Sequence, residues 1–184
     1  MSFFNTPYIY GRLTKSQIDA LDTSILQIGD NVYNTDILKE EFWNGTAWIN
    51  DDCIEAINIS GVTLMEGDLV NIDNTAIAAL DASVKLSTNA TTSWGIGAVY
   101  RGGLNNNRVV IAMKGNYKVL FTSATTSTTR QQIAQISATA GQASSTGSKV
   151  GAVGSLGVIA ETYGVGTVPA DRLIRCWLNS MESF

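Results

Sequence analysis

The chain has 184 residues, which is enough for one ordinary domain or for a small domain with an appendage. Only 15% of the residues are charged, the formal net charge is −4, and the lysines and arginines are scattered, so we expect no nucleic-acid partner. The chain opens with no charged-then-apolar leader and contains no apolar run as long as a membrane span, so we expect synthesis in a cytoplasm and no membrane partner.

The opening segment forms an aromatic arm. Phe3, Phe4, Tyr8 and Tyr10 have little neighbouring sequence that could bury them. Exposed aromatic side chains of this kind commonly contact a partner, in the same oligomer or in an adjacent molecule. The alternative is that the arm folds back onto its own domain.

A short helix follows the arm. Thr14 and Gln17 have the spacing of a capping box, and Ile18 and Leu21 mark one helical face. Three strands are predicted next, at 29–35, 39–43 and 46–50. Asn44-Gly45 predicts a two-residue hairpin turn before the last of them, because both residues tolerate a positive φ.

Trp43 and Trp48 flank this predicted turn. They are candidates for a surface that stacks on sugar rings. The alternative is that the two tryptophans pair with each other or cap a core, as hairpin tryptophans commonly do.

The pattern of residues 61–121 predicts a series of short β-strands and shows almost no helical periodicity. Short strands at this spacing indicate a barrel or a sandwich.

One pattern occurs twice in the chain. In it, a glycine-led apolar strand is joined through a glycine-rich loop to a second strand. The first copy comprises 94–100 and 108–113, and the second comprises 155–160 and 172–178. A duplicated β unit favours a scaffold or binding surface over a single reactive pocket.

Between the two copies lies a hydroxyl-rich segment, 122–148, with thirteen serines and threonines. We predict a long, partly ordered surface excursion there, although Ile133 and Ile136 are able to anchor a strand or a helical turn. The expected domains are therefore an N-terminal module over 1–58 and a β domain over 59–184 that carries this excursion.

The candidate catalytic residues are few. The chain has no histidine, which excludes Ser-His-Asp and Cys-His nucleophiles and imidazole metal ligands. Asp51, Asp52 and Glu55 lie close together in sequence, and a pair of carboxylates at suitable separation hydrolyses glycosides. We interpret them, with Glu40 and Glu41, as turn and edge-strand charges instead. We expect no enzyme.

Metal sites and disulfides are not expected either. Asp30, Asn31, Asn34 and Asp36 are rich in oxygen but do not follow a known calcium loop. Cys53 and Cys176 are far apart in sequence, and buried thiols are favoured over a disulfide. No cofactor is predicted.

Two stretches resemble proteins of tailed-bacteriophage virions. Gly61 to Asp73, with the phrase Gly67-Asp68-Leu69-Val70, resembles the capsid cement or decoration family, as do the runs 84–87, 96–99, 109–112 and 115–119. Separately, 13–51 resembles a module of phage fibres and other appendages, around 29–36 and 42–48.

The resemblance implies a fold and a function. The expected fold is mainly β: a small β-barrel, β-tulip or sandwich with a duplicated strand unit, preceded by an extended arm, a short helix and a β-hairpin. The expected function is decoration of the capsid exterior as a homotrimer bound to the major capsid protein, with Phe3, Phe4, Tyr8 and Tyr10 contacting a neighbour. The alternative is a trimeric fibre or receptor-binding module that binds a host glycan through Trp43, Trp48 and the hydroxyl-rich segment.

Overall fold

The computed structural model describes residues 7–73, 82–87, 96–122, 127–128, 133–146, 155–160, 163–164 and 173–179. The protein is mainly β and divides into two compact units, Met1–Asp51 and Asp52–Phe184. Sequence analysis placed the boundary later, at residue 58. The difference arises because strand β5 (Cys53–Asn58) pairs antiparallel with β9 (Arg108–Ala112) and thus belongs to the second unit.

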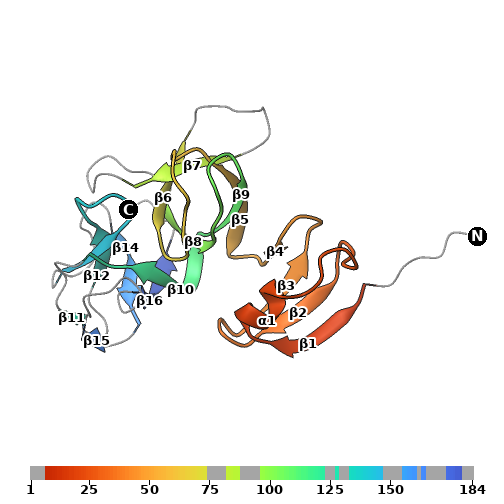
Figure 1. Cartoon of the computed structure of the whole chain (residues 1–184). Coiled ribbons are helices and arrows are strands. Elements are labelled where there is room, and N and C mark those ends of the chain that lie inside the picture. Colours follow the sequence, from red (N-terminus) through yellow and green to blue (C-terminus); the bar gives the residue numbers. More distant parts are fainter. Residues whose placement is uncertain are drawn as a thin grey trace, which may run out of the picture. The chain divides into compact units, whose positions relative to one another are not determined.

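The first unit is a four-stranded sheet with one short helix (Figure 1). The strands lie in the order β1-β2-β3-β4, with β1 and β2 parallel and the other neighbours antiparallel. The elements are β1 (Ile9–Leu13), α1 (Lys15–Asp19), β2 (Asn31–Asn34), β3 (Lys39–Trp43) and β4 (Trp48–Ile49). Ile18, Val32, Trp43 and Trp48 form the buried core of this unit.

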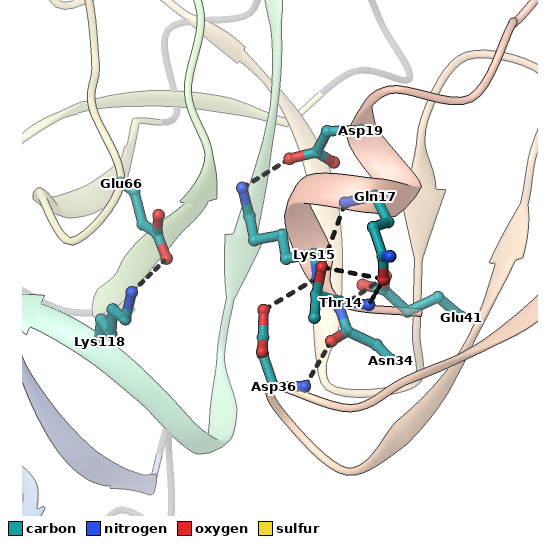
Figure 2. A network of polar contacts seen from close by, with 9 residues as sticks. All are labelled: Thr14, Lys15, Gln17, Asp19, Asn34, Asp36, Glu41, Glu66 and Lys118. Carbon is teal, nitrogen blue, oxygen red and sulfur yellow. Dashed lines mark hydrogen bonds and ion pairs between the residues drawn. The ribbon is translucent and has the colours of Figure 1, made fainter. Parts of the chain in front are cut away.

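Helix α1 begins at the predicted capping box. The Gln17 N–H donates to Thr14 Oγ1 over 3.3 Å, and the Thr14 N–H donates to Gln17 Oε1 over 2.8 Å (Figure 2). These bonds satisfy N–H groups that have no partner within a helix, so the helix starts at a defined residue. Ile18 then fixes its orientation because it is buried in the core.

The β3–β4 hairpin differs from its prediction in the length of its turn. Trp43 lies opposite Trp48, so the loop has four residues, Asn44 to Ala47, rather than two. Asn44 Oδ1 accepts the N–H groups of Thr46 (2.9 Å) and Ala47 (2.8 Å), and Gly45 has a φ of +103°. The Asn44 side chain thus stabilises a wider loop in which only the glycine needs a positive φ.

The second unit begins with a closed five-stranded barrel (Figure 1). Its strands run β5-β7-β6-β8-β9 around the barrel. The remaining bounds are β6 (Leu69–Asp73), β7 (Ser83–Leu86) and β8 (Ile96–Arg101). Alternate strand side chains point inward and, together with Leu64 and Met113 from flanking segments, form a buried core. The strand residues of this core are Ala56, Val70, Val84, Val99, Val109 and Ile111. Burying such side chains contributes about 1.5–3 kcal/mol each for the larger ones, which stabilises the closed barrel.

A second five-stranded sheet follows, in the order β10-β16-β14-β12-β13. Its strands are β10 (Lys114–Leu120), β12 (Ile133–Ile136), β13 (Ala143–Thr146), β14 (Ser155–Ile159) and β16 (Leu173–Asn179). The edge strands meet at a parallel bridge between Phe121 and Ala143, where the Thr122 N–H donates to the Ala143 carbonyl over 2.9 Å. Gly115 and Asn116 both lie inside β10.

The hydroxyl-rich segment 122–148 is therefore not a surface excursion in its described part. Strand β12 lies inside the second sheet, between β14 and β13, and Ala134 and Ile136 are buried. Each buried apolar residue of β12 is separated from the next by one polar residue, which is the spacing of a strand.

The barrel and the second sheet repeat one topology. In chain order, β5, β6, β7, β8 and β9 correspond to β10, β12, β13, β14 and β16. In both sheets the fifth strand pairs with the first and the fourth, the second pairs with the fourth and the third, and the third runs parallel to the first. The predicted duplication of the fourth and fifth strands is confirmed, and it extends to all five.

The duplication also preserves residue register. In the barrel, Leu69 lies opposite Ala98 and Val70 opposite Gly97; in the second sheet, Ile133 lies opposite Val158 and Ala134 opposite Gly157. An accessory contact is repeated as well. The bridge between Leu64 and Gly103 corresponds to the pairing of β11 (Ser127–Thr128) with β15 (Tyr163–Gly164).

Main-chain bonds join the barrel to the second sheet. The Leu69 N–H donates to the Gly141 carbonyl (2.8 Å), and the Gly141 N–H donates to the Ser87 carbonyl (2.7 Å). The Leu120 N–H donates to the Gly67 carbonyl over 2.8 Å. The turn between β12 and β13 therefore bonds to both the start of β6 and the end of β7.

Candidate functional site

The described part of the aromatic arm is attached to the sheet of the first unit. The Tyr8 N–H donates to Asp30 Oδ1 over 2.7 Å, and the Tyr8 carbonyl accepts the Asn31 N–H over 2.9 Å. The Tyr8 side chain itself is exposed. Phe3 and Phe4 lie outside the described residues.

Tyr10 packs onto its own domain. Its ring meets the Trp48 ring edge-on, with 6.0 Å between the centroids, and the Tyr8 ring at 4.7 Å. Partial burial, and after it the charge of the Asp30 carboxylate, raises the pKa of the Tyr10 hydroxyl. Within the arm, Tyr8 thus keeps a side chain available to a partner, whereas Tyr10 contributes to the edge of the core.

Trp43 and Trp48 do not form an exposed stacking surface. Their exposed fractions are 8% and 3%, and their ring centroids lie 5.8 Å apart. They occupy opposite positions of the β3–β4 pair and point to the core side of the sheet, where Val32 is also buried. The alternative interpretation of the hairpin tryptophans, in which they pair and complete a core, is confirmed.

Two of the carboxylates considered for hydrolysis lie close to cations. Glu55 Oε2 lies 3.2 Å from Arg108 Nη1, and Asp52 Oδ1 lies 3.9 Å from Lys114 Nζ. Asp51 is exposed at the end of the first unit. The pairing of Glu55 with Arg108 links adjacent strands β5 and β9, which is a contribution to the barrel wall.

The oxygen-rich residues of the first unit form a structural network (Figure 2). The buried Glu41 carboxylate accepts a bond from Asn34 Nδ2 over 3.1 Å. Asn34 Oδ1 accepts the Asp36 N–H (2.9 Å), and Asp36 Oδ2 accepts the Lys15 N–H (2.9 Å). These bonds connect the β2–β3 turn to the start of α1. Glu40, the neighbour of Glu41, is exposed.

An exposed apolar cluster that sequence analysis missed lies at one end of the barrel. Val62, Met65 and Leu104, here called the loop-end cluster, are all exposed. Leu64 and Gly103, their neighbours in sequence, exchange two main-chain bonds of 3.0 and 3.1 Å, so the two loops lie side by side. No local pattern identifies this cluster, because its members come from loops about forty residues apart.

Asp68 shapes the loop that carries Met65. Its Oδ2 accepts the Met65 N–H over 2.8 Å, and its carbonyl accepts the Val99 N–H over 2.8 Å. Burial raises the pKa of the Asp68 carboxyl, and the bond from the Met65 N–H opposes this effect. The Gly-Asp phrase of the sequence therefore marks a turn that joins the loop-end cluster to the barrel wall.

Neither cysteine is part of a disulfide. Cys176 is buried, and Cys53 is half-buried with its Sγ 3.6 Å from the Tyr117 hydroxyl. The preference for thiols over a disulfide is confirmed. Cys176 lies opposite Tyr117 and Ile159 in the second sheet and serves there as a small apolar side chain.

Among the described residues, no group of three or more histidine, cysteine, aspartate or glutamate side chains is arranged to hold a metal ion. No helix in the described part of the chain has the length and apolarity that a membrane span requires. A scan against models of protein families and a search of curated proteins both give no match.

Proposed function

We propose that this chain is a structural protein of a virion that decorates the outer surface of a phage capsid and binds the major capsid subunits. The observation that carries the proposal is the repeated five-stranded unit of residues 52–184. Ion pairs within this unit, Glu55–Arg108 and Glu66–Lys118, link segments of its framework. A unit of this kind can carry extended binding surfaces. The sequence resemblance to capsid decoration proteins indicates that the partner is the capsid.

The mechanism would be burial of apolar surface against several capsid subunits. Two regions are candidates for the contact. One is the arm with Phe3, Phe4 and the exposed Tyr8, and the other is the exposed loop-end cluster of Val62, Met65 and Leu104. A protein that binds only the assembled lattice stabilises that lattice by mass action. Binding through side chains of this kind needs no cofactor and no catalysis.

The alternative role as a glycan-binding fibre module is not favoured by a specific observation. Trp43 and Trp48 are buried, so a glycan would have to bind to some other surface.

The test is co-sedimentation of the purified chain with undecorated, expanded phage capsids. We expect saturable, stoichiometric binding by the wild type. We expect at least about tenfold weaker binding when Phe3, Phe4 and Tyr8 are replaced by serine, or when Met65 and Leu104 are, because interface residues of this size each contribute about 1–2 kcal/mol. Tyr10 is retained in both variants, since its ring packs on Trp48. A wild-type chain that stays in the supernatant would refute the capsid role.

A further inference from the structure

The repeat gives each position on the barrel wall a counterpart in the second sheet. One outward-facing row of the barrel contains Leu69, Ala98, Ala112 and Cys53, which are consecutive cross-strand neighbours. The registers of the second sheet place Ile133, Val158, Trp177 and Asn116 in the corresponding row. Residues on either side of each row, such as Ile111 and Cys176, are buried in the interiors.

The second sheet covers the row of the barrel. The turn at Gly141 bonds to Leu69, and the Tyr117 ring packs against Tyr100 of β8 with 5.2 Å between centroids. The Tyr117 hydroxyl also lies next to Cys53 at the other end of the row. Consequently Leu69, Ala98 and Ala112 are all fully buried, although they lie outside the barrel core.

In the corresponding row of the second sheet, Trp177 is 54% exposed, whereas its counterpart Ala112 is 0% exposed. Trp177 belongs to β16, which is flanked by β10 and β14, so the tryptophan stands on the sheet wall rather than at a loop or a chain end. Large aromatic side chains in such positions are the residues that contribute most to protein interfaces.

We propose that this row of the second sheet, centred on Trp177, binds a second copy of the chain. The contact within one chain supports this proposal. There the second sheet, which has the same topology as the barrel, already packs on the equivalent row of the barrel. Repetition of that contact between molecules joins the barrel of one copy to the second sheet of another. Such a head-to-tail contact uses two different surfaces, so it generates a closed ring or an open chain. This self-association is independent of the capsid role.

The test is the molar mass of the full chain in solution, measured by light scattering after size-exclusion chromatography. We expect the wild type to form an oligomer whose mass is a multiple of 19.6 kDa. Trp177→Lys should shift the mass to that of the monomer with an unchanged circular dichroism spectrum. Ile25→Lys is the matched control, because Ile25 is 63% exposed in the first unit, and it should keep the wild-type mass.

Two results would overturn the proposal. One is a wild type that remains monomeric at about 100 µM, a concentration that populates even weak complexes. The other is a Trp177→Lys oligomer of unchanged mass. If the wild type is monomeric and Trp177→Lys abolishes its binding to capsids, the row belongs to the capsid interface instead.

If Trp177→Lys fails to fold, a fluorescence measurement tests whether Trp177 lies in the interface between copies. In a Trp94→Phe chain the remaining tryptophans are Trp177 and the buried Trp43 and Trp48. Dilution of this chain should expose Trp177 and shift its emission to longer wavelength as the mass falls. A mass that falls with no change in emission would place the interface elsewhere. Substitutions in the loop-end cluster can abolish capsid binding without changing the molar mass of the oligomer. The two proposals can therefore fail separately, and co-sedimentation and light scattering show which one has failed.

Discussion

Gly67 shows how one residue joins the barrel to the second sheet. It precedes β6, has a φ of +90°, and its carbonyl accepts the Leu120 N–H. A Cβ atom at this position would overlap Leu173 Cδ2 and would lie 3.0 Å from the Leu120 nitrogen. Because a backbone atom cannot rotate away, the position needs glycine for both its conformation and its space.

We therefore expect Gly67→Ala to lower the free energy of unfolding by about 3 kcal/mol, from the positive φ together with the overlap. Gly61→Ala is the matched control. Gly61 has a φ of +81° but nothing within 4 Å of its Cβ position, so we expect a loss of only about 1 kcal/mol there. Urea denaturation followed by circular dichroism measures both values. Equal losses in the two variants would show that the overlap of the added Cβ with Leu173 and Leu120 has no cost and would contradict this argument.

At the scale of elements, the β3–β4 hairpin is stabilised more by hydrogen bonds to the Asn44 side chain than by the hydrogen bonds between its strands. Strand β4 has only two residues, so few ladder bonds hold it. Asn44 Oδ1 accepts bonds from the N–H groups of Thr46 and Ala47 within the loop and from Thr46 Oγ1. The hairpin in turn positions Trp48, whose ring packs on Trp43 and Tyr10.

Asn44→Ala should lower the free energy of unfolding of the first unit by about 1 kcal/mol, because two loop N–H groups lose their acceptor. Asn44→Asp retains an acceptor oxygen in the same place and should remain within about 0.5 kcal/mol of the wild type. Amide hydrogen exchange at Thr46 and Ala47 measures the local effect, and urea denaturation measures the global one. Unchanged exchange at these two amides in Asn44→Ala would contradict the assignment.

At the scale of the molecule, the two units have separate cores. One is built around Val32 with Trp43 and Trp48, and the other around barrel residues such as Val109 and Ile111. Stability is a local property where cores do not share side chains, so each unit should open with its own free energy.

Val32→Ala should weaken protection of the β2 and β3 amides from hydrogen exchange by about 2 kcal/mol, because it leaves a cavity in a packed core. Protection of the β8 and β9 amides should stay unchanged. The reciprocal variant, Val109→Ala, should weaken β8 and β9 and spare β2 and β3. If either change lowered protection in both units to the same extent, the chain would unfold as a single cooperative body.

The sequence by itself determined the features that depend on nearby residues. The capping box of α1 is formed by residues three apart, and the alternation that defines each barrel strand has a period of two, so both are visible in the sequence. The glycine-led repeat likewise predicted the pairs β8–β9 and β14–β16. In the hairpin the sequence located the turn but not its length, which the Asn44 hydrogen bonds set.

Only the tertiary structure decided which faces are buried, because that depends on elements distant in sequence. Strand β12 is central in its sheet although its surroundings are rich in serine and threonine, since β14 and β13 pair with its two edges. For Trp43 and Trp48 the sequence left both a surface and a core position open, and the sheet placed them beside Val32 in the core. Ala112 and Trp177 occupy corresponding positions on repeated strands, yet only Ala112 is covered, because the second sheet packs on the barrel and the described part of the chain provides no third unit to pack on the second sheet.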